Sequence, residues 1–149
     1  VGEALLQREA GVRYRMNTSA HATTKAGAIP WRLSVENSGG GLFLDVGSHA
    51  LDLIDFFSGP MQDLHSNVAR LASPAEVEDA VTITFRTAAG VPGAASWNFA
   101  SHANEDQLEF SGTLGRVSLA VFSNEPARLE TARGVESIDL PNPAHISSR

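Results

Sequence analysis

The titratable side chains with the most suggestive spacing are Asp45, His49 and Asp52, in the segment LFLDVGSHALDLIDFFS. On an α-helix, residues three and four positions apart are neighbours, so Asp45 would lie one turn before His49 and Asp52 one turn after it. A histidine changes charge near neutral pH; flanking carboxylates favour its charged form, and burial opposes it. The spacing therefore favours general acid/base chemistry at His49.

Two other interpretations of this cluster stay open on spacing alone. An Asp-x-x-x-His pair on an amphipathic helix is most often a surface pair without a chemical role. A metal site would recruit Asp45, His49 and a third ligand such as Asp52 or His65, which is a weaker pattern than His-Glu-x-x-His. We therefore expect no metal.

The segment before the cluster holds further candidates for ligand contact. Trp31 and Arg32 lie beside a glycine triplet, Gly39 to Gly41, where the indole can stack on a ligand and the guanidinium can hydrogen-bond it. Surface packing is the alternative for both. The glycines allow close backbone approach, and the start of the following helix adds partial positive charge. The triplet follows no predicted strand, so it is not a dinucleotide fingerprint.

One long helix must position these residues. The spacing predicts a helix over Leu42–Ser58 that ends at Gly59-Pro60, a typical stop signal. Before it, the pattern is weakly helical through Gly11 and then alternates as a strand over Val12–Met16. Residues 17–41 read as a long loop. The expected apolar stripe of the helix consists of Leu42, Val46, Ala50, Leu53 and Phe57.

After Pro60 the chain reads as β-structure. Short alternating runs separated by turn residues predict an antiparallel meander. One helix before such a meander gives a single α+β domain over residues 1–149, with a mostly antiparallel sheet and helices packed on one face. Seven side chains could form an apolar sheet face, and the other face then needs polar residues or a partner; they are Val81, Ile83, Phe85, Trp97, Phe99, Leu108 and Phe110. The expected strands lie at Asn67–Leu71, Val81–Arg86, Ala94–Ala100, Leu108–Phe110, Val117–Val121, Leu129 and Ile138–Leu140.

Composition excludes several function classes. The net charge is −6, which disfavours nucleic-acid partners because these need a basic surface. Lys25 is the only lysine and has no phosphate-loop or Schiff-base context, and the chain has no cysteine. No apolar run reaches the roughly 18 residues of a membrane span, so we expect no membrane partner.

Longer motifs carry a family resemblance. Trp31-Arg32, the glycine triplet, Asp45-x-Gly47-x-His49-x-x-Asp52 and the closing Gly59 follow one another in the order that the C-terminal domain of Gfo/Idh/MocA oxidoreductases shows. Glu78-Asp79-Ala80 before a strand and the hairpin Leu108–Gly115 extend the match over nearly the whole chain. The chain therefore resembles that C-terminal domain.

The resemblance implies a two-domain enzyme that uses NAD or NADP to oxidise or reduce a sugar, inositol or related polyol. His49 would then be the general acid/base and Asp45 would orient it and bind substrate. Trp31 and Arg32 would line the cleft, with Arg32 and Gly41 also near the cofactor. The resemblance further implies a cytoplasmic homo-oligomer that associates through the sheet face.

Two features of the family pattern are missing from the sequence. There is no Rossmann fingerprint and no Glu-Lys-Pro motif, so the cofactor would be bound mainly by a separate N-terminal domain, and we expect this chain alone to be inactive. Residues 141–149 resemble the approach to a C-terminal helix that the chain does not complete. The alternative is a stand-alone, non-enzymatic module for sugar binding or dimerisation.

Overall fold

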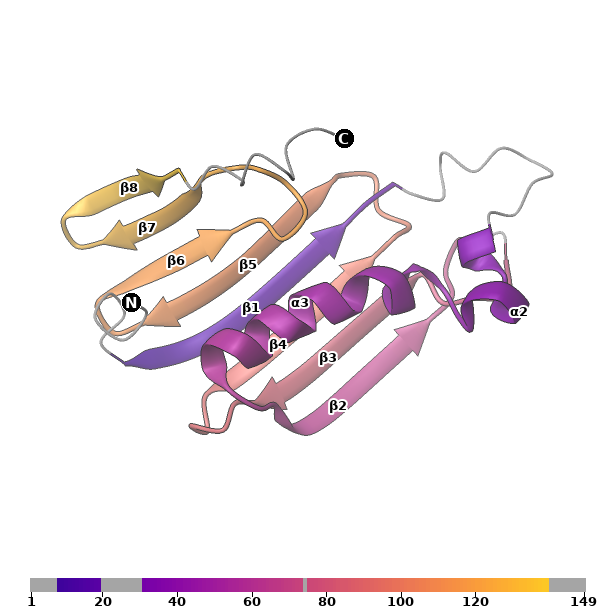
Figure 1. The fold of residues 1–149 in the computed structure, drawn as a ribbon, viewed down its shortest axis with the longest axis horizontal. Coiled ribbons are helices and arrows are strands. Elements are labelled where there is room, and N and C mark those ends of the chain that lie inside the picture. The colour runs from indigo at the N-terminus through magenta and orange to yellow at the C-terminus, as the bar shows by residue number, and fades with distance from the viewer. Residues whose placement is uncertain (1–7, 20–30, 74, 140–149) are drawn as a thin grey trace.

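The computed structural model describes residues 8–19, 31–73 and 75–139. Over these residues the chain forms an eight-stranded sheet with one long helix, α3 (Leu42–Ser58), lying across one face (Figure 1). This confirms the predicted α+β class. Two short helices, η2 (Trp31–Leu33) and α2 (Val35–Ser38), precede α3. The strands are β1 (Glu9–Asn17), β2 (Gln62–Ala69), β3 (Ala80–Arg86), β4 (Pro92–Asn98), β5 (Glu105–Gly112), β6 (Gly115–Leu119), β7 (Ala127–Thr131) and β8 (Gly134–Ile138).

The sheet is not the simple meander that the sequence predicts. Its strand order is β2-β3-β4-β1-β5-β6-β7-β8, so β1 is inserted between β4 and β5. β1 runs parallel to β4 and antiparallel to β5, and the other neighbours are antiparallel. Parallel strands need a crossover connection, usually a helix, and α3 lies in the connection between β1 and the later strands.

The core lies between α3 and the sheet. Alternate residues of β3, β4 and β5 are buried, as period-two strands with one covered face require. The seven apolar residues singled out in the sequence are all buried in the cluster that also contains Ala50 and Ile54 of α3. They therefore cover the inner face of the sheet. The opposite face carries polar and charged side chains, among them Arg13, Arg15, Glu109 and Arg116.

The bounds predicted for α3 are confirmed. It ends where Gly59 adopts a φ of 77°, a left-handed backbone value that favours glycine. Its fully buried positions are Gly47, Ala50 and Ile54, so the buried stripe is rotated from the predicted one, and Phe57 is 59% exposed. Phe57 lies at the edge of the core, with its ring 5.4 Å from that of Phe110.

Three other sequence predictions need correction or fall partly on residues outside the described ranges. Part of the predicted loop over 17–41 is helical, at η2 and α2. β2 begins at Gln62, earlier than the predicted Asn67. The weak helix expected near the N-terminus falls partly on β1, and its first seven residues lie outside the described residues, as do Lys25 and residues 141–149.

Both ends of α3 are tied to the sheet side of the molecule. At its start, the amide of Gly41 donates hydrogen bonds to both carboxylate oxygens of Glu78, at 2.8 and 2.9 Å. At its end, the Ser58 hydroxyl donates to Glu9 of β1 at 2.6 Å. Between them, the ring of Phe43 packs edge-on against Trp97 at 4.9 Å. These contacts fix which face of α3 points away from the sheet.

Candidate active site

Three of the predicted site residues lie in contact at the start of α3. The Nε atom of Arg32 is 2.9 Å from an Asp45 carboxylate oxygen, and both side chains are about half exposed. The Arg32 guanidinium also lies over the Trp31 ring, 5.0 Å from its centroid. Asp45 occupies the first turn of α3, where the helix dipole stabilises a negative charge. Aromatic ring, cation and carboxylate therefore form one continuous exposed row.

His49 lies one turn further along the same helix and is also exposed. Its imidazole packs against Phe122, with ring centroids 5.5 Å apart and planes at 87°. Asp52 follows one turn later and is exposed. His65, the alternative third metal ligand, lies on the edge strand β2. Among the described residues, no group of three or more His, Asp or Glu side chains is arranged to hold a metal ion.

The Gly41 amide is already engaged within the domain. It is buried, and its amide already donates to Glu78. A Cβ atom at this position would lie 2.3 Å from the backbone oxygen of Glu78, so the site accepts only glycine without rearrangement. Contact between the Gly41 amide and a cofactor would require displacement of the Glu78 carboxylate.

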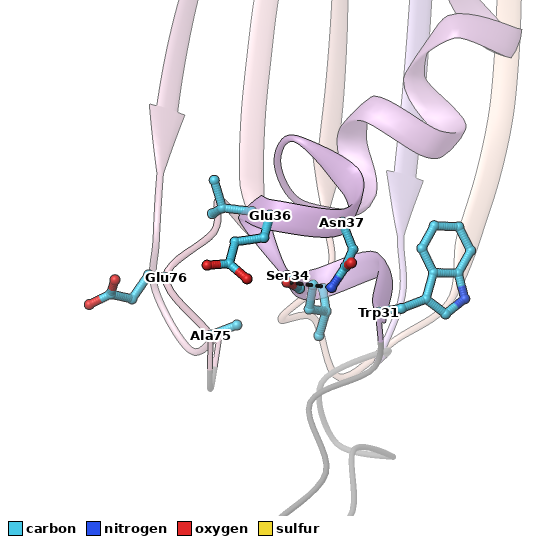
Figure 2. A pocket seen from close by; sticks show the side chains of 8 residues that line it. Trp31, Ser34, Glu36, Asn37, Ala75 and Glu76 are labelled. Carbon is cyan, nitrogen blue, oxygen red and sulfur yellow. Dashed lines mark hydrogen bonds between the residues drawn. The ribbon is translucent and has the colours of Figure 1, made fainter.

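A hollow of about 480 Å³ opens beside Trp31 (Figure 2). It lies between the η2–α2 segment and the loop before β3, and the Asn37 side chain donates to the Ser34 hydroxyl along its wall at 3.0 Å. Asp45 and His49 do not line it; both lie on an exposed face of α3. The lining residues are Trp31, Leu33, Ser34, Val35, Glu36, Asn37, Ala75 and Glu76.

Phe122 is held in place by a polar pair that the sequence did not single out, the half-buried Asp106 and the buried Tyr14. Its amide donates to one oxygen of Asp106 at 2.6 Å, and the Tyr14 hydroxyl donates to the other at 3.1 Å. Tyr14 is completely buried. Burial, followed by the charge of Asp106 and this hydrogen bond, raises the pKa of the Tyr14 hydroxyl far above its ordinary value.

Comparison with known proteins agrees with this fold and with the sequence motifs. A family model described as the GFO/IDH/MocA C-terminal domain matches residues 3–118. The chain belongs to this family. The matched region includes Trp31, Arg32, Asp45 and His49, and it ends within β6, so Phe122 lies beyond it.

Individual relatives of this GFO/IDH/MocA domain are oxidoreductases by name. Oxidoreductase P35 of Formosa agariphila is 23% identical over 142 residues, covering 95% of this chain and 42% of that protein. A levoglucosan dehydrogenase in complex with NADH and levoglucosan superposes with a TM-score of 0.79 at 18% identity, covering 93% of this chain and 41% of the other. The aldose-aldose oxidoreductase from Caulobacter crescentus, complexed with glycerol, gives a TM-score of 0.77 at 19% identity, covering 95% and 43%. The chain thus spans less than half the length of these proteins.

Proposed function

We propose that this chain is the substrate-side domain of an NAD(P)-dependent oxidoreductase that acts on a CH–OH group of a sugar, inositol or related polyol. The observation that carries the proposal is the exposed row of contacts from Trp31 and Arg32 of η2 to Asp45, which lies one turn before His49 on the exposed face of α3. The relatives whose names include levoglucosan and an aldose support the substrate class. The family membership supports the reaction type.

His49 and Asp45 have different roles in the proposed reaction. His49 takes the hydroxyl proton when the alcohol is oxidised and returns it when the carbonyl is reduced, because imidazole exchanges a proton near neutral pH. Asp45 accepts hydrogen bonds from substrate hydroxyls one turn before His49; among the described residues it pairs with Arg32 and not with the imidazole, so we do not assign it the orienting role that the motif implies. The ion pair with Arg32 holds the Asp45 carboxylate in place. The hydride chemistry at the substrate carbon would be supplied by a bound nicotinamide.

The exposed side chains of Trp31 and Arg32 are better suited to contact the planar, polar nicotinamide ring than the buried Gly41 is. A guanidinium carries five N–H donors, and the Nε donor of Arg32 is the one paired with Asp45. Trp31 is 61% exposed and offers a flat surface for stacking. We therefore assign Trp31 and Arg32 to the cofactor-facing side and regard Gly41 as the structural start of the helix.

The exposure of His49 bears on how the complete site is built. Hydride and proton transfer are favoured where water is excluded, because electrostatic interactions strengthen there. An open helix face does not provide this exclusion by itself. In the proposed enzyme, a Rossmann domain that binds NAD or NADP covers the face of α3 bearing Asp45 and His49. Consistent with this, we expect the 149-residue chain alone to show no turnover.

The test compares two histidine variants of the two-domain enzyme. His49→Ala should lower kcat for polyol oxidation by roughly 10²–10⁴-fold, the usual contribution of a general acid/base. His102→Ala is the matched control, because His102 is an exposed histidine in the loop between β4 and β5. It should keep wild-type kcat. Equal rates in the two variants would refute the role of His49.

We also propose that the face of the sheet opposite α3 mediates homo-oligomerisation. This face carries charged side chains paired across strands: Arg15 with Glu105 at 2.7 Å, and Arg116 with both Glu109 and Glu130. Because this face carries both positive and negative side chains in fixed positions, a second copy can place its acidic side chains against the basic ones of the first. Light scattering at tens of micromolar should give a dimer or larger assembly. A clean monomer would refute the proposal.

The interface can be located with a matched pair of substitutions. Ser96 lies on the outer face of β4, beside Arg15 and Thr82 of the neighbouring strands. Ser96→Arg should shift the chain toward monomer, since it adds a bulky charge at the centre of the face. Ser48→Arg places the same change on the exposed side of α3 and should leave the assembly intact.

A further inference from the structure

The His49 imidazole is held by a ring contact. Among the described residues no hydrogen bond or ion pair involves this side chain, and its ring contact is the edge-on packing against Phe122 at 5.5 Å. An exposed histidine without such a contact samples several rotamers. Phe122 therefore restricts the directions in which the imidazole can point.

Phe122 is itself fixed to the core through its backbone. It lies in the segment between β6 and β7, which contains no regular structure. The 2.6 Å hydrogen bond from its amide to Asp106 ties this segment to β5. Asp106 pairs with Met16 of β1 in the sheet register, which places its side chain on the same face as α3.

The second oxygen of the Asp106 carboxylate is held by a residue of the core. It accepts from the hydroxyl of Tyr14, a fully buried residue whose ring packs 5.3 Å from that of Trp97. Core packing thus determines where the Asp106 carboxylate points, and the carboxylate determines where Phe122 lies. The order of contacts is core, Tyr14, Asp106, Phe122 and His49.

We propose that Asp106 and Phe122 are positioning residues for His49. Asp106 holds the backbone of the β6–β7 segment, and the Phe122 ring holds the imidazole in the orientation used for proton transfer. This inference rests on the proposed function of His49 and deepens it. Small misplacements of a catalytic group are costly, up to about 10²-fold in rate for a shift of roughly 1 Å.

The first test needs no activity, because it observes the imidazole directly. In the 149-residue chain, the carbon-bound proton resonances of the His49 ring are assigned by their loss in His49→Ala. A neighbouring aromatic ring displaces such resonances, so Phe122→Leu should move them and Phe122→Tyr should restore them close to the wild-type position. Phe56→Leu is the control, since Phe56 is a 78% exposed phenylalanine on α3 whose ring contact is with Phe57.

Asp106→Asn tests the backbone link separately. The amide can accept from only one of the two donors, so Phe122 should lose its fixed position and the His49 resonances should move in the same direction as in Phe122→Leu. Should Asp106→Asn fail to fold, Phe122→Leu decides alone, because Phe122 is 46% exposed and its replacement leaves the core intact.

The second test is kinetic and uses the two-domain enzyme. Phe122→Leu should lower kcat by roughly tenfold to 10²-fold with KM little changed, and Phe122→Tyr should recover kcat. His49 resonances unchanged in Phe122→Leu would overturn the positioning role even if His49→Ala is inactive. Wild-type kcat in His49→Ala would instead overturn the proposed function and leave the resonance result standing. The two failures are therefore distinguishable.

Discussion

Removal of the Glu78 carboxylate is expected to loosen the helix that carries the proposed catalytic pair. Glu78 lies just before β3, and its two oxygens accept from the amide of Gly41, the N-cap residue of α3. Neither Gly41 nor Ser34 provides a side-chain cap for the helix that follows it. The carboxylate thus supplies, from a distant segment, the bond to the N-cap amide that a glutamate at the third helical position supplies in a capping box.

The magnitude follows from the two interactions that Glu78→Ala removes. A hydrogen bond to a charged group contributes about 1.5–3 kcal/mol net. The interaction of a carboxylate with a helix N-terminus contributes about 0.3–1 kcal/mol. Partial exposure of Glu78 favours the lower ends, so we expect a loss of about 2 kcal/mol in the free energy of unfolding. For a chain of this size, that corresponds to a fall in Tm of roughly 4–8 °C.

Urea unfolding followed by far-UV circular dichroism measures this loss. Glu78→Gln should lose about half as much, because its amide oxygen can still accept one hydrogen bond. Glu76→Ala is the matched control: Glu76 is exposed two residues earlier, and its change should stay within about 0.5 kcal/mol. A Glu78→Ala loss no larger than that of Glu76→Ala would refute the capping role.

Two further predictions concern the same helix and the buried tyrosine. Gly41→Ala should destabilise the chain by about 1–3 kcal/mol, because the new Cβ would clash with the backbone oxygen of Glu78. Gly40→Ala is the control and should destabilise it less, since the closest contact of its Cβ would be the flexible end of the Leu44 side chain. Equal losses of stability in urea unfolding would contradict this prediction. Tyr14 is the only tyrosine of the chain, so tyrosinate absorbance reports on it alone. Since folding raises its pKa above the ordinary 10.0, its contribution to stability is complete below about pH 10 and falls as the pH rises further. Tyr14→Phe should remove this fall, and tyrosinate absorbance near pH 10 with the fold intact would refute it.

The long helix could be predicted closely because its determinants are local. The apolar spacing and the Gly59-Pro60 stop define α3 to the residue. The alternation of apolar and polar residues predicts β3 equally well, since the strand begins at Ala80, one residue before the predicted start. The start of β2 is difficult to predict, because every one of its residues is exposed. Its register also shifts between Gln62 and His65, where Asp63 has a φ of 50°. An edge strand of this kind leaves no period-two apolar pattern.

Long-range pairing could not be predicted from periodicity. The insertion of β1 beside β4 depends on contacts between segments far apart in sequence, which a local pattern does not contain. The site shows the same division. The helix spacing placed Asp45 and His49 together, whereas Glu78, Asp106 and Phe122 reach the site from separate elements. Glu78 belongs to the motif Glu78-Asp79-Ala80, but no local sequence pattern indicates the contacts that Glu78, Asp106 and Phe122 make.

The pH dependence of kcat for the two-domain enzyme tests the central claim most directly. If His49 is the general acid/base, the pH profile of wild-type kcat should contain an ionisation that belongs to this side chain. In His49→Ala that ionisation should disappear, leaving a low and nearly flat rate. An unchanged inflection in His49→Ala would contradict the account and assign proton transfer to another group.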